Sequence, residues 1–273
     1  MRKKVIILLM VSLITILLSA CHTSRNTSDN GSKAEDSASG SKTSDSEEIE
    51  QFSTESDKEA TQVGYTPIGV KVLKIDNEEN DTDYIYVNSK EGWKASYEYI
   101  GMFKENVTLY KTEDSGISWS ELTSTVKDNY TIPLSAKSGM IFTDSKNGWI
   151  TTEIPQPGYI GLYKTSDGGI TWDEQTLVIP DVYADIEFET YPPVFFTLND
   201  AILLSNTLEE DLEQLVYVTH DGGVSWTQVK KNDDAMFQWN YANNSSDGNA
   251  SDWEVTYNAK TWRTVDVITW EQE

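Results

Sequence analysis

A short motif occurs three times in this chain at an almost constant interval, and this repeat limits the fold more than any other feature. Each copy begins with Thr, carries Asp two positions later and Gly two positions after that, and ends in Trp. The final Trp residues lie 53 and then 54 positions apart. The three copies are Thr112–Trp119, Thr165–Trp172 and Thr219–Trp226. A period of this length indicates one supersecondary unit per repeat, each stacked on its neighbours.

A second element recurs in register with the first. Val87–Trp93 and Thr143–Trp149 both end in Gly-Trp, and Thr197–Ile202 is a weaker third copy. Short runs rich in β-branched and aromatic residues, such as Asp83–Val87 and Val107–Tyr110, predict strands. The folded part of the chain holds about four such periods. We therefore predict an all-β protein of about four units, each a four-stranded sheet.

The residues inside the motif are those of a tight hairpin turn. An Asp carboxylate can accept hydrogen bonds from the N–H groups of its own turn, and Gly permits positive φ. The Trp lies in the strand that follows the turn, where its ring can fill the space between adjacent sheets. We therefore interpret nine residues as structural: Asp114, Gly116, Trp119, Asp167, Gly169, Trp172, Asp221, Gly223 and Trp226.

The pattern Ser/Thr-x-Asp-x-Gly-x-Thr/Ser-Trp resembles the BNR or Asp-box repeat of sialidases, the sortilin ectodomain and photosystem II assembly and stability factors. The resemblance covers most of residues 63–273 and implies a β-propeller whose boxes lie on hairpins away from the usual ligand face. The Gly-Trp element makes the chain most similar to the assembly-factor branch. Family members usually have six or seven blades, so four units imply either a small closed ring or an open arc.

The fourth unit is the least regular. We place a degenerate fourth box at Thr261-Trp262, with Asn258 near the Asp position and no Gly in its turn. This Trp follows the previous box Trp by only 36 positions, which argues against regular closure. In a closed ring, Ile68–Ile75 would pair with Val265–Trp270, which we predict as strands. An open arc would expose sheet edges that a partner or a second copy must cover, which predicts a homodimer as an alternative.

The N-terminal residues predict export and lipid anchoring. Three cations at positions 2–4 precede an apolar run from Val5 to Leu18, which is typical of a signal peptide and shorter than the roughly 20 residues of a spanning helix. The run ends in Leu-Ser-Ala-Cys, which resembles the bacterial lipobox. That resemblance implies cleavage after residue 20, acylation of Cys21 by diacylglyceryl and palmitate groups, and attachment to the extracytoplasmic face of a bacterial membrane, with a Gram-positive cell membrane favoured.

The next block predicts a tether. Residues 21–62 hold the lipidated Cys and a stretch rich in Ser and acidic residues, in which Ile49 and Phe52 are the only large apolar side chains. Such a composition predicts a disordered linker with a reach of roughly 35 Å. The expected organisation is therefore a signal peptide over 1–20, a linker over 21–62 and an Asp-box domain over 63–273.

Charge and composition exclude several classes of protein. The chain has 45 Asp and Glu against 21 Lys and Arg, a formal charge of −24. The signal peptide carries three cations and no carboxylate, so its removal lowers the charge to −27. This charge argues against nucleic acid as a partner, because Lys and Arg must neutralise phosphates. Two His and one Cys exclude an internal disulfide and a three-His zinc site.

Catalytic patterns are few. Sialidase activity needs three arginines that clamp the substrate carboxylate. Arg263 is the only Arg after the linker, so we exclude sialidase activity. The chain has no Gly-x-Ser-x-Gly elbow, phosphate loop or His-Glu-x-x-His motif. His220 lies inside the third box, where we expect an exposed turn residue. A glycosidase that uses two carboxylates stays open, although no spacing singles out a pair.

Three further segments are candidate sites. Asp185, Glu187 and Glu189 alternate along a predicted strand and could bind calcium, the one cofactor we consider, although we favour solvated surface charge as their explanation. Trp239, Tyr241 and Trp253 flank an Asn/Ser/Gly-rich loop, which suits either a ligand-binding site or an ordinary blade strand. Tyr191-Pro-Pro predicts a rigid loop at a blade edge.

These observations favour a lipid-anchored extracytoplasmic protein that binds a partner without chemistry of its own. The assembly-factor resemblance implies a scaffold that assists the assembly or stability of another exported or membrane protein. The alternative is a cell-surface glycan-binding module or a glycoside hydrolase other than a sialidase. The partner is accordingly an unidentified protein or glycan outside the membrane.

Overall fold

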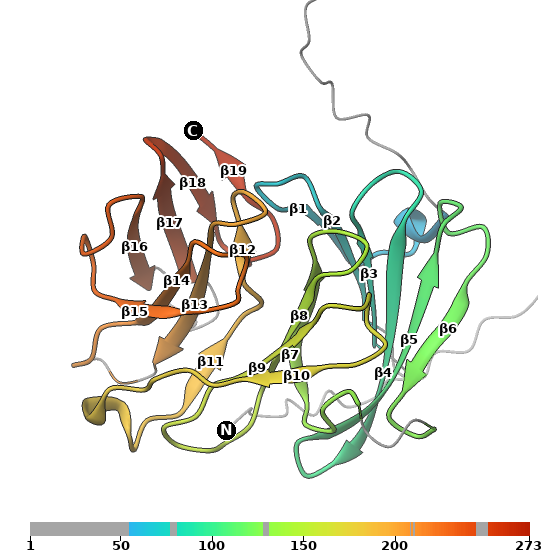
Figure 1. Ribbon diagram of the computed structural model, residues 1–273, viewed down its shortest axis with the longest axis horizontal. Helices are drawn as coiled ribbons and strands as arrows, with labels where there is room; N and C mark the ends of the chain where they lie inside the picture. Colours follow the sequence, from blue (N-terminus) through green and yellow to red (C-terminus); the bar gives the residue numbers. More distant parts are fainter. Residues whose placement is uncertain (1–54, 77–80, 128–130, 208, 210, 244–250) are drawn as a thin grey trace, which may run out of the picture. The chain divides into compact units, whose positions relative to one another are not determined.

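The computed structural model of the chain describes residues 55–76, 81–127, 131–207, 209, 211–243 and 251–273 (Figure 1). They all belong to one compact unit. Its regular elements are strands and two 3₁₀ turns, η1 (Glu55–Lys58) and η2 (Asp181–Tyr183). Within these ranges no helix is long and apolar enough to span a membrane. The prediction of an all-β protein is confirmed.

Part of the predicted linker belongs to this folded unit. The Lys71 ammonium, in a side chain only 2% exposed, pairs with the Asp57 carboxylate of η1 at 2.6 Å. Residues 55–62 are therefore packed against the first sheet. The predicted signal peptide, Cys21 and the linker up to residue 54 lie outside the described residues.

The strands form four antiparallel sheets that follow one another along the chain. The first sheet has six strands in chain order: β1 (Gln62–Tyr65), β2 (Lys71–Ile75), β3 (Asp81–Tyr86), β4 (Gly92–Gly101), β5 (Lys104–Thr112) and β6 (Ser120–Ser124). The second sheet consists of β7 (Lys137–Phe142), β8 (Gly148–Thr152), β9 (Gly161–Thr165) and β10 (Asp173–Gln175).

The other two sheets come from the C-terminal half. The third consists of β11 (Phe188–Thr190), β12 (Val194–Phe195), β13 (Ala201–Thr207), β14 (Leu215–Thr219) and β15 (Thr227–Val229), with β11 and β12 both paired to β13. The fourth consists of β16 (Phe237–Asn243), β17 (Ser251–Tyr257), β18 (Lys260–Thr264) and β19 (Glu271–Gln272). This β-propeller-like arrangement matches the four predicted units, with the hairpin β1–β2 added to the first.

Adjacent sheets pack face to face through large aromatic rings. Trp93 of β4 stacks on Phe142 of β7, with ring centroids 3.9 Å apart and planes 3° from parallel. Trp149 of β8 packs on Phe195 of β12 at 4.4 Å, with the rings tilted. One core runs through the first three sheets, and a second core lies between the third and the fourth. The recurring Gly-Trp element therefore supplies the contact from one sheet to the next.

The first and fourth sheets also meet, through β1. The backbone N–H of Trp270 donates to the carbonyl of Tyr65 at 3.1 Å, and the Gln62 side-chain amide donates to Asp266 at 2.8 Å. Figure 1 shows β19 beside β1, at the ends of the colour range. Contacts thus link each sheet to the next and the last to the first.

The sequence predicted a contact between the first and last sheets, but it assigned this contact to the wrong segments. β2 pairs only with β1 and β3, and residues 265–270 form a turn, not a strand. Gly64 of β1 lies against this turn so closely that a Cβ would be 2.6 Å from Oγ1 of Thr269. A segment with β-branched residues is typical of a strand, but here its backbone groups are bound within the turn itself.

Each box occupies the turn between the third and fourth strands of its unit. In the second box, the Thr165 hydroxyl accepts a hydrogen bond from the Gly169 N–H at 2.9 Å. The Asp167 carboxylate accepts the N–H groups of Ile170 and Thr171 at 3.1 and 2.9 Å, and the Thr171 hydroxyl at 2.7 Å. The first and third boxes repeat these bonds: the Gly N–H donates to the Thr hydroxyl, and the N–H and hydroxyl of the Ser before Trp both donate to the Asp carboxylate.

The fourth box lies at Thr264–Trp270, and its prediction at Thr261-Trp262 was wrong. The Asp266 carboxylate accepts the N–H groups of Ile268 and Thr269 at 2.9 and 2.7 Å. Residues 258–259, where we placed the degenerate turn, are instead the two-residue connection between β17 and β18, both with positive φ.

Two changes conceal this box in the sequence. It is one residue shorter than the others, and Val267, with φ of 53°, stands where they have Gly. The Trp270 indole still donates to the carbonyl of this residue at 3.3 Å, as Trp172 does to Gly169 at 3.2 Å. The last two box Trp residues are therefore 44 positions apart rather than 36, which reduces the irregularity that argued against closure.

Candidate functional site

A pocket of about 110 Å³ is lined by residues of all four sheets. We call it the central pocket. Its lining includes Val72 of β2, Gly139–Ile141 of β7, Tyr191–Val194 leading into β12, and Asp266–Ile268 of the fourth box. No single sheet could form this pocket, since each contributes only a few residues to one wall.

The walls of the central pocket are mainly apolar. Pro192 and Pro193 fix the backbone on one side. Gly139 brings β7 against them, because a Cβ at this position would lie 2.8 Å from Cγ of Pro192. The Tyr191-Pro-Pro segment is therefore a rigid wall of a pocket rather than an isolated loop at an edge.

The charged groups at the central pocket already have partners within the chain. The Asp266 carboxylate accepts hydrogen bonds from its own turn and from Gln62, and these bonds hold its pKa below the usual value although burial acts to raise it. The Lys74 ammonium lies 4.0 Å from Asp83. Burial raises the pKa of Asp83, to which the Tyr97 hydroxyl donates at 3.1 Å. The pocket therefore offers an occupant mostly apolar contact.

The predicted aromatic ligand site is part of the core. Trp239 and Trp253 are 6% and 1% exposed, and their rings pack together at 5.8 Å between the third and fourth sheets. Tyr241 is half-buried against Trp253 at 4.9 Å. These rings lie along β16 and β17 toward the neighbouring sheet, which favours the interpretation as ordinary blade strands. The ligand-binding interpretation stays a prediction. The loop 244–250 is outside the described residues.

The predicted calcium cluster does not form. Asp185, Glu187 and Glu189 are all exposed, and β11 begins only at Phe188, so the three carboxylates do not alternate along one strand. In the described ranges, no three His, Cys, Asp or Glu side chains come together as metal ligands. The alternation in sequence was not sufficient because the strand is shorter than the acidic run.

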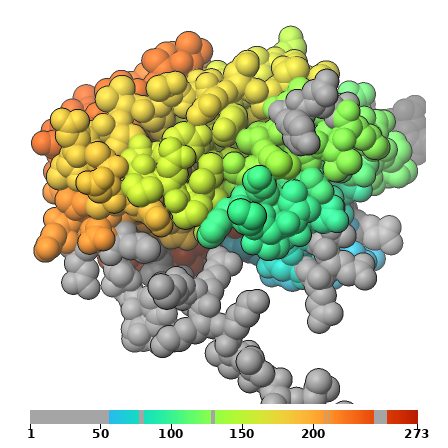
Figure 2. Space-filling view, turned by 90° about the horizontal axis from the view of Figure 1, so that it is seen from below, coloured from blue at the N-terminus to red at the C-terminus, as the bar shows by residue number. Residues whose placement is uncertain are grey.

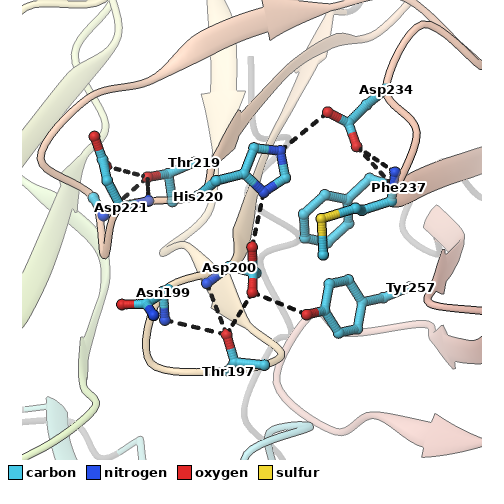
Figure 3. Close-up of polar contacts among 11 residues, drawn as sticks. Thr197, Asn199, Asp200, Thr219, His220, Asp221, Asp234, Phe237 and Tyr257 are labelled. Carbon is cyan, nitrogen blue, oxygen red and sulfur yellow. Dashed lines mark hydrogen bonds and ion pairs between the residues drawn. The ribbon is translucent and has the colours of Figure 1, made fainter.

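His220 forms a brace that the sequence did not predict (Figure 3). Its Nδ1 lies 2.8 Å from Asp200 in the turn between β12 and β13, and its Nε2 lies 3.1 Å from Asp234 in the segment leading to β16. Asp200 also accepts the hydroxyl of Tyr257 of β17 at 2.9 Å, and Asp234 accepts the backbone N–H of Phe237 at 2.8 Å. The brace therefore ties the third box to the fourth sheet.

The carboxylates determine the charge of this imidazole. The hydrogen bond with Asp200 and the second one with Asp234 raise the pKa of His220. Burial acts to raise the pKa of both carboxyls, but the hydrogen bonds from His220 hold both below their usual value. With a carboxylate on each ring nitrogen, the imidazole has no free nitrogen for proton transfer to a substrate. We interpret the brace as structural.

The carboxylates of the box residues are engaged within the chain. They accept hydrogen bonds from their own turns, which keeps the pKa of Asp221 at about 2 although burial acts against it. Trp172 is buried, and Trp119 and Trp226 are half-buried. Sequence reasoning missed Val72, Gly139 and Asp266 of the central pocket, because no local pattern links single residues of different sheets.

Comparison with known proteins adds little. No family model matches the chain, and no curated protein matches it. Among solved structures, one described as YCF48 bound to D1 peptide is similar over 50% of this chain and 39% of that chain, with 23% identity and a TM-score of 0.26. The likeness thus spans well under half of that protein's length. At this TM-score it supports no conclusion about ligand or partner.

Proposed function

We propose that this chain is a lipid-anchored extracytoplasmic binding protein of the Asp-box propeller type, which holds part of a partner polypeptide in its central pocket. In this role it assists the assembly or stability of another exported or membrane protein. The protein performs no chemistry of its own.

The central pocket is the observation that carries this proposal. Its volume of about 110 Å³ is well below the roughly 300–1,000 Å³ of small-molecule sites. It is closer to the ~150 Å³ cavity that accepts one benzene ring. An apolar pocket of this size suits one side chain of a polypeptide. Rigid walls favour such binding because little conformational entropy is lost.

The lipid anchor rests on the signal peptide and Cys21. Replacing Cys21 with Ala should abolish incorporation of labelled palmitate and release the protein from the membrane fraction. Palmitate incorporation that persists in the Cys21→Ala variant would refute the anchor. This assay is independent of the pocket.

The pocket is tested by site-specific photocrosslinking in cells. A photoreactive amino acid at Thr66, in the pocket lining, is compared with the same group at Ile117, which is 86% exposed on the first box. We expect one dominant crosslinked protein from position 66 and none from position 117. Equal patterns from both positions, or a crosslink to wall saccharide alone, would contradict the proposal.

A blocking variant completes the test. Thr66→Trp adds an indole to the loop between β1 and β2 at the pocket, and it should remove the crosslinked partner when the crosslinker is moved to the neighbouring position 67. A thermal melt must show that the variant is folded. A partner that is retained although the introduced indole fills the pocket would place its binding site elsewhere.

A further inference from the structure

The hairpin formed by β4 and β5 extends past its neighbours. Pairing between β3 and β4 ends at Asp81 and Tyr97, whereas β4 and β5 continue to pair as far as Gly101 and Lys104. On the other side, β6 pairs with β5 only from Thr108 onward. Beside this end, residues 134–136 run along β5: Lys104 bridges Ser135, and the Glu105 N–H donates to the Leu134 carbonyl at 2.9 Å. The end of the hairpin, which we call the ribbon, therefore extends beyond β3 and β6 at the lower edge of Figure 1, with one further segment along its β5 side.

Large apolar side chains occupy the end of this ribbon. Four of residues 99–103, which we call the hairpin tip, are exposed to solvent: Tyr99 68%, Ile100 47%, Met102 86% and Phe103 51%. Figure 2, which views the molecule from below, shows the teal-green segment near residue 100 on the face toward the reader. Burial of such side chains stabilises a folded protein, and here about half or more of the surface of each contacts water.

The backbone of the hairpin tip is unusual for its residue types. Gly101 has φ of 94°, and Met102 and Phe103 follow with φ of 54° and 55°. Bulky side chains rarely adopt this left-handed region, where Gly, Asn and Asp are the usual turn residues. The Ala136 N–H donates to the Phe103 carbonyl at 2.8 Å and holds this conformation. The turn thus presents apolar groups where polar turn residues would cost less.

Polarity changes in steps along the ribbon. The apex carries Ile100, Met102 and Phe103, at the level where the exposed Lys104 pairs with Gly101, and Tyr99 stands opposite Glu105 at the next level. Behind them, Asn106 donates to the Glu98 carboxylate at 3.0 Å. Apolar side chains are thus outermost, with charged and amide side chains behind them, which follows the polarity from acyl chains to water across a membrane interface. A protein-binding face would more naturally spread its apolar groups along one side of the ribbon.

We propose that the hairpin tip inserts into the outer leaflet of the membrane that carries the lipid anchor. This inference rests on the proposed function, because the anchor brings the tip to the surface. Thirty-three residues separate Cys21 from Glu55, and the linker that the sequence predicts here would reach roughly 30 Å. The tether converts tip insertion into an intramolecular step, so weak affinity of the tip is sufficient.

The net charge specifies the kind of lipid. A chain of charge −27 is repelled by anionic headgroups, and the tip supplies only Lys104 against Glu98 and Glu105 behind it. Insertion should therefore be deepest in zwitterionic lipid. Insertion should also orient the domain, with the hairpin tip toward the membrane and the box turn of the first sheet away from it. The tip and this box turn lie at opposite ends of β5.

The experiment supplies the tether artificially, so its result does not depend on acylation of Cys21. Residues 22–273, which lack the only natural Cys, carry an N-terminal hexahistidine tag bound to nickel-chelating lipid in phosphatidylcholine vesicles. An environment-sensitive dye is attached at Met102→Cys or, as the matched control, at Ile117→Cys, since both native residues are 86% exposed.

We expect the dye at position 102 to shift to shorter wavelength and to be quenched by brominated acyl chains, and the dye at 117 to do neither. Phosphatidylglycerol at one third of the lipid should reduce the shift. Adding Phe103→Ser and Ile100→Ser to Met102→Cys should remove most of it, with circular dichroism unchanged. A water-like spectrum at position 102 on both compositions, or a shift that survives these two substitutions, would overturn the proposal. Failed palmitate labelling of Cys21 would instead count against the anchor alone.

Discussion

The indole N–H of Trp93 donates a hydrogen bond at 2.9 Å to the carbonyl of Gly168, which lies 75 positions further along the chain, in the box of the next sheet. The same indole stacks on Phe142. One side chain therefore connects the Gly-Trp element of the first unit to the Asp-box turn of the second. The packing recurs in the next unit, where Trp149 lies against Gly223 of the third box, but there the carbonyl of Gly222 accepts from Lys164 and the indole N–H of Trp149 has no hydrogen-bond partner among the described residues.

Loss of this stack should strongly destabilise the protein. Phe142 is fully buried, so Phe142→Ala is expected to lower the free energy of unfolding by about 3–5 kcal/mol through lost burial and a cavity. Urea denaturation followed by tryptophan fluorescence measures the change. The exposed Ile117→Ala should stay within about 0.5 kcal/mol. Similar midpoints for the two variants would show that the stack contributes nothing.

Trp93→Phe separates the hydrogen bond from the stacking. The smaller ring can still lie on Phe142, but the buried Gly168 carbonyl loses its donor, which costs about 1–3 kcal/mol. We therefore expect a loss smaller than that of Phe142→Ala. A neutral Trp93→Phe variant would mean that the indole N–H is not needed.

The fourth box should matter for the contact between the first and last sheets. Asp266→Ala removes the acceptor for its turn and for Gln62, and we expect a loss of about 1–3 kcal/mol because three partly buried donors remain unpaired. Asp114→Ala, in the solvent-exposed first box, should cost less. Hydrogen exchange of β1 amides should rise only in the Asp266 variant, and equal exchange in both would contradict this role.

The His220 brace predicts a specific dependence of stability on pH. Because the folded pKa of His220 is raised, its contribution is fully present below the unfolded value near 6.5 and is lost as pH rises through the folded pKa. Asp200 and Asp234 have lowered pKa values in the folded protein, so their contribution to stability is lost only as pH falls through those values. The stabilisation is about 1 kcal/mol or less, because the imidazole is 42% exposed.

Urea denaturation of the wild type and of His220→Gln at several pH values measures this contribution. The difference in unfolding free energy should be largest at mildly acidic pH and should shrink above neutrality. The other His, at position 22, lies in the predicted linker and serves as the control as His22→Gln. A difference that stays constant with pH would show that the imidazolium charge plays no part.

Gly139 should be intolerant of any side chain. Its φ is not in the left-handed region, so the restriction is steric: a Cβ would meet Cγ of Pro192 at 2.8 Å. Gly139→Ala should displace this wall of the central pocket, lower the melting temperature by a few degrees and reduce the crosslink from position 66. An unchanged crosslink yield would show that the partner does not use this wall.

The sequence by itself determined the class of fold and the position of three boxes. This was possible because the bonds of a box lie within eight consecutive residues, so that Asp, Gly and the hydroxyl residues must appear at set spacings. The strands of the first sheet could be predicted for a related reason. Alternation along β3 and β5 is a local property of the pleated backbone.

Only the tertiary structure decided the rest. The fourth box is one residue shorter than the others and has no Gly. It is held by a contact with Gln62 of β1, which lies 204 positions earlier in the chain. Trp239 and Trp253 are core residues because the third sheet covers the face from which they project, and sequence does not state which face is covered. His220 finds Asp200 and Asp234 across turns, and the central pocket takes a few residues from each sheet. Such sites depend on distances between segments, and those distances are set by how the four sheets pack.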